Sequence, residues 1–345
     1  MLVDTENCTA RSADAKLHML SHGTSYDAKF LRTYDGMAGA IEKRRAYGNS
    51  DGFQFPKSTK VPPEVELPGG IIASVNYCAD SPVTLSIQDG QPQISIGEES
   101  LSVCFTPRPQ FYDARLPTGR RVAEIATVYG KRTLVLFTPG HCQYFSTGDE
   151  CRFCSLRTTR QTQSDHRMNI TPAEAAAAVA IALREPDMQF SHVLLNGGTL
   201  TDYDEGFRKH LDLLSEIRMS GLPENVELHV ITMPPRDHTL LARLADLNVT
   251  IAMSIEVFDE GVFAELCPGK SGSYGRSRFL DAFDETVDVL GNGRVYAGFV
   301  AGLEPASRLI DGMHYFGERG IVPAVNVFHF DPGTALERHP RPTVD

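Results

Sequence analysis

From about residue 130, strand-like apolar runs alternate with amphipathic helical segments, and this alternation constrains the fold more than any other feature. The predicted strands are 133–137, 192–195, 226–232, 249–255, 295–300 and 324–330. The predicted helices are 172–185, 204–220, 238–247, 277–291 and 306–319. Strands that alternate with helices are typical of a parallel sheet whose faces are covered. Six units are too few to close an eight-stranded barrel, so we predict an α/β fold containing a partial (β/α)6 TIM-like barrel.

Local patterns fix where individual helices of this repeat begin and which face they bury. In the segment 204–220, apolar residues recur every three or four positions and would form one buried face. Thr171 fits a helix N-cap, Pro172 fits the first helical position, and Glu174 fits the reciprocal partner of a capping box. We therefore expect the helix at 172–185 to begin directly after Thr171.

The region before the repeat has a different organisation. A helix is predicted at 26–47, and the Pro- and Gly-rich segment 49–70 is typical of a linker. Short strands are predicted at 71–78, 83–88, 93–96 and 101–105, with Asp89-Gly90 as a hairpin turn. We therefore predict two parts. Residues 1–125 form an N-terminal mixed α/β, β-rich accessory or capping region, and residues 126–345 form the partial barrel.

Composition narrows the class of protein. The chain has 345 residues, of which 41% are hydrophobic, so it can bury a full core. A formal net charge of −11 argues against non-specific binding to nucleic acid or to a membrane surface. No apolar run approaches the roughly 20 residues of a membrane span, and the first residues do not resemble a signal peptide. We expect a cytoplasmic protein with a small-molecule substrate, no nucleic-acid partner and no membrane partner.

Three of the seven cysteines, Cys142, Cys151 and Cys154, lie in one short segment directly after the first predicted strand of the repeat. Three thiolates can hold three irons of a [4Fe–4S] cluster and leave the fourth iron open to another ligand. A cluster that only transfers electrons takes four cysteines, so the three-cysteine set indicates a cluster that reacts with what it binds. The other cysteines (Cys8, Cys78, Cys104 and Cys267) are scattered, and we interpret each as a buried or incidental thiol.

Two other interpretations of this segment remain open at this stage. One is a zinc-dependent hydrolase or lyase on a TIM-like sheet, and the other is a non-catalytic iron–sulfur sensor. Structural zinc takes four closed ligands, commonly from paired C-x2-C or Cys/His sets. His141 could supply the fourth ligand, but neighbouring residues rarely both reach one tetrahedral ion, and the sequence has no second C-x2-C pair. We therefore favour an iron–sulfur cluster.

The cysteine segment and the strand ends together resemble the radical S-adenosylmethionine (SAM) superfamily over roughly residues 130–335. That family usually spaces its cysteines as C-x3-C-x2-C, whereas this chain has C-x8-C-x2-C with the aromatic Phe153 before the last cysteine. The segment Leu195-Asn-Gly-Gly-Thr199 resembles the family's Gly-Gly-Glu segment, with Thr199 in place of Glu. The run Cys267-Pro-Gly-Lys270 and the closing segment 328–334 resemble the biotin-synthase-like branch.

The resemblance implies roles for individual residues. Cys142, Cys151 and Cys154 would hold the cluster, and backbone carbonyls at the Gly197-Gly198 strand end would receive the SAM ammonium group. Polar contacts to the ribose or the methionine carboxylate would come from Ser254 and Glu256, and the adenine would pack along the segment that contains Gly302. Arg276 would pair with the carboxylate, a role for which Arg278 competes. The remaining candidates are the cofactor-binding residues Phe153 and Thr199 and the substrate-binding residues Lys270 and His329.

The activity implied is reductive cleavage of SAM at the cluster to methionine and a 5′-deoxyadenosyl radical, which abstracts hydrogen from a small polar substrate. A one-electron donor such as flavodoxin or ferredoxin would reduce the cluster. The sequence contains no second three- or four-cysteine set, so we do not expect an auxiliary cluster. His192, at the start of the second predicted strand, is expected to help pack that strand.

Overall fold

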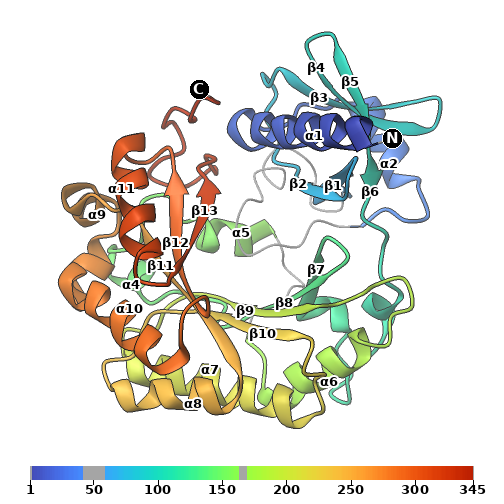
Figure 1. Cartoon of the computed structure of the whole chain (residues 1–345). Helices are drawn as coiled ribbons and strands as arrows, with labels where there is room; N and C mark the ends of the chain where they lie inside the picture. The colour runs from blue at the N-terminus through green and yellow to red at the C-terminus, as the bar shows by residue number, and fades with distance from the viewer. Residues whose placement is uncertain (1, 42–58, 163–168, 345) are drawn as a thin grey trace.

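The centre of the molecule is a curled seven-stranded sheet (Figure 1). The computed structural model describes residues 2–41, 59–162 and 169–344. In spatial order the strands are β13 (Val322–Val327), β12 (Val295–Ala301), β11 (Val249–Glu256), β10 (Glu227–Ile231), β9 (His192–Asn196), β8 (Thr133–Phe137) and β7 (Ala126–Tyr129). Strands β8 to β13 are parallel, and β7 pairs with β8 antiparallel at the edge. The predicted α/β partial barrel is therefore confirmed.

Helices cover the outer face of the curled sheet, as Figure 1 shows. They are α6 (Pro172–Ala182), α7 (Tyr203–Met219), α8 (Ala242–Asp246), α9 (Glu260–Leu266), α10 (Arg276–Leu290) and α11 (Ala306–Gly317). The main apolar cluster lies between these helices and the outward-facing strand residues, among them Val193, Leu228 and Ile251. The predicted capping box is present: the Glu174 backbone N–H donates to Thr171 Oγ1, and the Thr171 backbone N–H donates to the Glu174 carboxylate.

The edges of the sheet differ from the sequence-based prediction. Strand β7 was not predicted, because its four residues form only the outer arm of a hairpin with β8. The last strand, β13, ends at Val327 rather than at residue 330. One backbone bond, from the Phe328 N–H to the Ala301 carbonyl, follows it before the chain leaves the sheet. The predicted helix 238–247 is divided into a 3-10 turn, His238–Leu241, and α8.

Within its described residues, the N-terminal part contains two antiparallel three-stranded sheets and two α-helices around a second apolar cluster. Its elements are α1 (Leu2–His22), α2 (Ala28–Asp35), β1 (Glu64–Leu67), β2 (Ile71–Ser74), β3 (Val83–Gln88), β4 (Gln91–Ile96), β5 (Glu99–Ser102) and β6 (Cys104–Phe105). The Asp89-Gly90 turn is confirmed, because Gln88 pairs with Gln91 across it.

Three sequence predictions in this part need correction. Helix α1 was not predicted, although Ala15 and Met19 bury one side of it. The predicted helix 26–47 ends at Gly36, where α2 stops, and the end of that prediction falls on residues 42–58, which are not described. The predicted linker 49–70 contains β1, which pairs with both β2 and β6.

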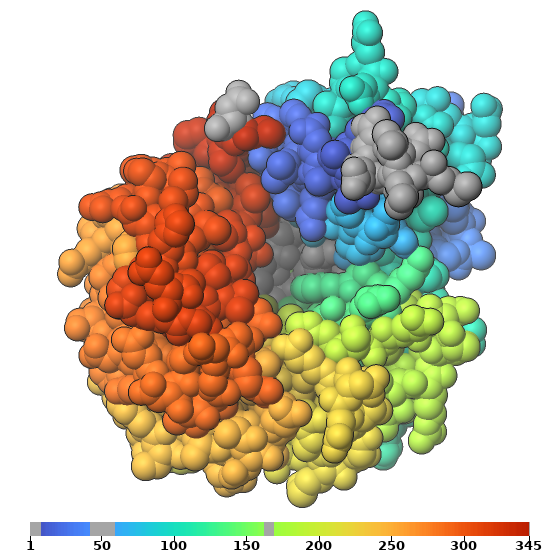
Figure 2. Space-filling view, viewed as in Figure 1, coloured from blue at the N-terminus to red at the C-terminus, as the bar shows by residue number. Residues whose placement is uncertain are grey.

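The N-terminal part contacts the β7–β8 edge of the curled sheet and the C-terminal segment that follows β13. Beside the β7–β8 turn, Glu66 forms an ion pair of 2.6 Å with Lys131. Beside the C-terminal segment, Gly23 lies so close to Arg341 that a Cβ atom would be 2.7 Å from its guanidinium. Figure 2 shows a hollow between this part, in blue, and the C-terminal strands and helices, in red and orange. In line with the sequence-based prediction, we propose that residues 1–125 form an accessory or capping region of the partial barrel.

Within the described residues, no helix combines the length and apolar character needed to cross a membrane.

Candidate active site

The three clustered cysteines lie in the loop after β8, at the carboxyl ends of the parallel strands. Active sites of such sheets form at this end. The loop includes two short helices, α4 (Tyr144–Thr147) and α5 (Leu156–Thr162). Cys142 and Cys154 pack against a small apolar cluster inside the barrel. Cys154 also lies near enough to Cys142 and Cys151 for their charges to interact. The structure therefore brings together the three thiols that the sequence separates as C-x8-C-x2-C.

The three thiols differ in how readily they ionise. Burial raises the pKa of Cys142 and raises that of Cys154 well above its usual value. The pKa of Cys151 is instead lowered, chiefly because the Cys267 thiol hydrogen-bonds to it. A thiolate, not a thiol, is the form that binds metal. Cys151 is therefore the thiol that reaches the metal-binding form most readily.

Gly197 and Gly198, which directly follow β9, pack against the cysteine loop. A Cβ atom on Gly197 would lie 2.4 Å from the Thr138 carbonyl carbon, and one on Gly198 would lie 2.0 Å from the His141 carbonyl oxygen. The Gly198 N–H donates to the Pro139 carbonyl at 2.8 Å, and the Gln143 N–H donates to the Thr199 carbonyl at 2.8 Å. Only glycine allows the strand end and the loop to approach so closely.

A buried ion pair lies beside the cysteines. The Lys270 ammonium donates to Glu256 Oε1 and to the Ser254 carbonyl, each at 2.6 Å. Glu256 stands at a bulge of β11 with a φ of +70°, which turns its side chain out of the regular strand alternation. Burial disfavours the Lys270 charge, but attraction to Glu256, Cys151 and Cys267 outweighs burial and raises the pKa. The sequence assigned Lys270 to substrate and Glu256 to SAM, whereas the structure pairs them.

Cys267 is the residue of this site that sequence reasoning missed. It was interpreted as a buried or incidental thiol; it is fully buried, and it also hydrogen-bonds to Cys151. The next turn holds it in place: Gly269 packs so tightly on the Tyr144 ring that a Cβ atom would be 2.4 Å from it. The signal was present in the run Cys267-Pro-Gly-Lys270, whose cysteine and lysine both reach the cysteine loop.

The remaining candidates lie at neighbouring strand ends. The Arg276 guanidinium donates to the Phe258 carbonyl at 2.6 Å and stacks over the Phe258 ring. Arg278 forms an ion pair of 3.1 Å with Glu285 on α10, which leaves Arg276 as the better candidate of the two. Gly302 packs against Pro342. His329 Nδ1 lies 3.6 Å from the Asp331 carboxylate. Phe153 packs against the main apolar cluster.

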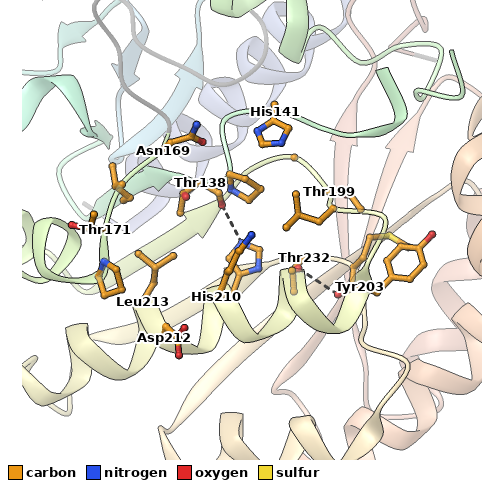
Figure 3. A pocket seen from close by; sticks show the side chains of 18 residues that line it. Thr138, His141, Asn169, Thr171, Thr199, Tyr203, His210, Asp212, Leu213 and Thr232 are labelled. Atoms are coloured by element: carbon orange, nitrogen blue, oxygen red, sulfur yellow. Dashed lines mark hydrogen bonds between the residues drawn. The ribbon is translucent and has the colours of Figure 1, made fainter. Parts of the chain in front are cut away.

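A cavity of about 510 Å³ lies on the other side of the cysteine loop, between the loop, the Gly198–Leu200 segment and helix α7 (Figure 3). His210 of α7 lies in its wall and contacts the Thr138 carbonyl at 3.0 Å through Nε2. Asn169 accepts a hydrogen bond from the Gly140 N–H at 3.0 Å. His210 and Asn169, which line the cavity, therefore also hold the first part of the cysteine loop in place.

Residues 141–301 match the radical SAM superfamily. Over 223 residues, the chain is 29% identical to the bacteriochlorophyllide c C-7(1)-hydroxylase of Chlorobaculum limnaeum. The alignment covers 59% of this chain and 54% of that protein, so the chain spans about half the length of this curated relative.

Two solved structures give more distant matches. Methylornithine synthase matches at 16% identity and a TM-score of 0.47, with 62% of this chain and 59% of the other covered. A radical SAM methyltransferase from Sphaerobacter thermophilus matches at 16% identity and a TM-score of 0.41, with 71% and 77% covered.

The matched family agrees with the cofactors expected from the cysteine segment, because radical SAM proteins use a [4Fe–4S] cluster and SAM. They take electrons from a donor and act on small molecules. The match begins at His141, next to the first cysteine of the loop, and ends at Ala301, the last residue of β12. The match to the radical SAM superfamily over residues 141–301 is therefore the basis of the function proposed below.

Proposed function

We propose that the chain is an enzyme that reductively cleaves SAM at a [4Fe–4S] cluster held by Cys142, Cys151 and Cys154. The observation that carries the proposal is the convergence of these three thiols at the carboxyl ends of the parallel strands. When bound, the cluster and SAM supply one-electron cleavage of a carbon–sulfur bond, which gives methionine and a 5′-deoxyadenosyl radical. That radical abstracts hydrogen from an unactivated carbon of a small polar substrate.

The donor set fits such a cluster. Three thiols lie in one loop, and a buried ammonium, Lys270, lies close enough to Cys142 and Cys151 to interact with their charges. Thiolates gathered in an apolar site repel one another, and a nearby cation offsets that repulsion. Glu256 holds Lys270 in place, although its own negative charge opposes ionisation of Cys151 and Cys154. The chain therefore supplies both the ligands and a cation beside them.

The residues around the loop would orient SAM and exclude water. The tight packing of Gly197 and Gly198 on the loop fixes the end of β9 beside Cys142. Carbonyl groups at this strand end are our candidates for the SAM ammonium, and Ser254 and Arg276 are our candidates for its ribose and carboxylate. The Thr199 carbonyl already accepts from Gln143, so its second lone pair is the one left for such a contact. Phe153, Gly302 and His329 keep the roles that the resemblance implies.

For the reaction that follows hydrogen abstraction, only a broad reaction class is proposed. The curated relative is named a hydroxylase, and hydroxylation of an unactivated carbon is one result of hydrogen abstraction from it. We propose oxidative or lyase-type conversion of a small polar molecule, with an electron donor such as flavodoxin or ferredoxin. The placement in the biotin-synthase-like branch rests on the run Cys267-Pro-Gly-Lys270 and stays part of this proposal.

The test is anaerobic. The purified full chain is reconstituted with iron and sulfide, mixed with SAM and dithionite, and 5′-deoxyadenosine is followed by mass spectrometry. Cys142→Ala removes one proposed ligand. Cys104→Ala is the matched control, because Cys104 is an exposed cysteine of β6 in the N-terminal part.

We expect 5′-deoxyadenosine from the wild type and from Cys104→Ala, and none from Cys142→Ala. Equal product from wild type and Cys142→Ala would show that this cysteine does not hold the reactive cluster. A colourless wild-type protein loaded with zinc would contradict the proposal as a whole.

A further inference from the structure

A second group of metal-binding side chains lies at the opposite end of the parallel strands. His192 and Glu227 are the first residues of β9 and β10 and are paired in register, and His229 follows on β10. Their neighbours Val193 and Leu228 belong to the apolar cluster under the outer helices. Because side chains alternate along a strand, His192, Glu227 and His229 point to the other face, into the barrel.

The three side chains are close to one another. One ligand atom from each lies within 4.8 Å of the other two. His229 Nδ1 is 3.7 Å from Glu227 Oε1, and the rings of His192 and His229 meet edge to face at a centroid distance of 5.3 Å. The Thr250 hydroxyl of β11 links the group, 2.5 Å from Glu227 Oε1 and 2.7 Å from His229 Nδ1.

One buried nitrogen of this group lacks a partner. His192 Nε2 is out of contact with solvent and makes no hydrogen bond in the part of the chain that the structure describes. A buried polar atom without a partner costs free energy. Glu227, in contrast, has a side chain that is 39% exposed, so an ion has a path into the group from solvent. A buried imidazole nitrogen without a partner, on a residue that is paired in register with an accessible carboxylate, is the arrangement of a ligand site.

We propose that His192, Glu227 and His229 form a binding site for a divalent transition-metal ion, with Zn²⁺ as the ion that fits best. Two imidazoles and one carboxylate are a donor set that zinc takes with a fourth position open to water. Hard cations such as Mg²⁺ and Ca²⁺ prefer an all-oxygen set. The thiols of the cysteine loop lie at the other end of the strands, so this site is separate from the proposed cluster.

The position of the site indicates what the ion would do. At the amino ends of barrel strands, side chains contribute to stability rather than to chemistry. An ion held by β9 and β10, with Thr250 of β11 hydrogen-bonded to two of the ligands, would tie three neighbouring strands together. Binding to the folded chain alone stabilises it by mass action.

The experiment uses Co²⁺ as a spectroscopic substitute for Zn²⁺ on the full chain after removal of bound metal. A site of nitrogen and oxygen ligands gives weak visible bands, whereas thiolate ligands give a strong near-ultraviolet charge-transfer band. One titration therefore measures the Co²⁺ bound at each end of the barrel separately. Displacement of Co²⁺ by Zn²⁺ then gives the zinc affinity of each site.

The variants are His192→Ala and Glu227→Gln. His238→Ala is the matched control, because His238 also lies beside a glutamate, 2.9 Å from Glu285, but has no second histidine in the group. Glu227→Gln keeps the size and polarity of the side chain, so it separates loss of a ligand from loss of the fold.

We expect the component without thiolate to bind Zn²⁺ in the wild type and in His238→Ala. Its affinity should fall more than about tenfold in His192→Ala and Glu227→Gln. The thiolate component should be equal in all four proteins. The proposal is overturned if the wild type shows only the thiolate component, or if the component without thiolate keeps its affinity in both variants.

Discussion

The two ends of the same parallel strands carry different donor chemistry. At the carboxyl ends, three thiols of one long loop, a glycine pair and a buried lysine come together from three separate segments. At the amino ends, side chains on the strands themselves bring together two imidazoles and a carboxylate. The first set requires chain that leaves the sheet and returns, whereas the second follows from strand register alone. The difference shows that the site at the carboxyl ends of the strands depends on close packing, which a single added atom can disrupt.

The largest effect is expected at the closest contact of the cysteine loop. In Gly198→Ala the new Cβ would meet the His141 carbonyl oxygen at 2.0 Å, and backbone atoms on both sides cannot move away. We expect a loss of about 5 kcal/mol in the free energy of unfolding, an exceptional value for one methyl group. Urea denaturation of the cluster-free chain measures it.

Gly272→Ala is the control for this prediction. Gly272 lies in the segment after Lys270, has ordinary backbone angles, and would place its Cβ in open space. Its substitution should change the stability by less than about 1 kcal/mol. Equal stability of the two variants would show that the strand end and the loop are not packed as described.

The next largest effect concerns the buried ion pair of Lys270 and Glu256. Loss of a charge here should cost more stability than loss of a charge at the amino ends of the strands. Lys270→Met leaves the Glu256 carboxylate buried without its cation, and we expect a loss of about 3 kcal/mol. Adding Glu256→Gln to Lys270→Met should restore part of the loss, because no unpaired charge remains. At the amino end, Glu227→Gln should cost about 1 kcal/mol or less, since Glu227 is more exposed. Thermal unfolding of the metal-free proteins ranks the variants; equal costs for Lys270→Met and Glu227→Gln would remove the contrast.

A smaller effect, which depends on pH, is expected at the start of α6. Burial disfavours the Glu174 charge, but hydrogen bonds from Thr171, Thr118 and Arg120 outweigh it and lower the pKa below its usual 4.5. A lowered pKa in the folded state means that ionised Glu174 stabilises the protein above that usual value. The contribution is lost as the pH falls through the lowered pKa.

Glu174→Gln should therefore cost about 2 kcal/mol at neutral pH and progressively less below pH 4.5. Denaturation of wild type and variant across this range measures the difference. A cost that is the same at pH 7 and at pH 3 would contradict the assigned charge.

The smallest expected effect concerns Cys267, the cysteine beside the three proposed cluster ligands. The Cys267 thiol hydrogen-bonds to Cys151, and a donor to a ligand sulfur stabilises the more negative, reduced cluster. Cys267→Ala should lower the reduction potential by about 40 mV, the equivalent of one hydrogen bond of about 1 kcal/mol. An anaerobic redox titration followed by electron paramagnetic resonance measures it, with Cys104→Ala as the control. An unchanged potential would assign Cys267 to packing alone.

The sequence predicted those features that depend on local pattern. The parallel strands β8 to β12 follow from apolar runs, and the start of α6 follows from the capping box at Thr171 and Glu174. The C-x8-C-x2-C spacing indicated the three thiols. Strand β7 was missed because four residues at a sheet edge carry little periodic signal.

Contacts between distant segments could not be predicted in the same way. Lys270 and Glu256 were assigned to different ligands, because nothing in a linear pattern says that a bulge at Glu256 turns one toward the other. Cys267 was set aside because spacing alone does not place it beside Cys151. The group of His192, Glu227 and His229 depends on the register of β9 against β10, and His192 was expected only to pack its strand.

The central claim is that three cysteines hold a cluster whose fourth iron is open to SAM. Electron–nuclear double resonance on the reduced, reconstituted protein with SAM labelled by ¹⁵N at the amino group and ¹⁷O at the carboxylate tests it directly. The account predicts hyperfine coupling of both labels to the cluster in the wild type, and loss of the cluster signal in Cys142→Ala. A cluster that forms and reduces but shows no coupling to either label would contradict the claim, because its fourth iron would then not be bound by SAM.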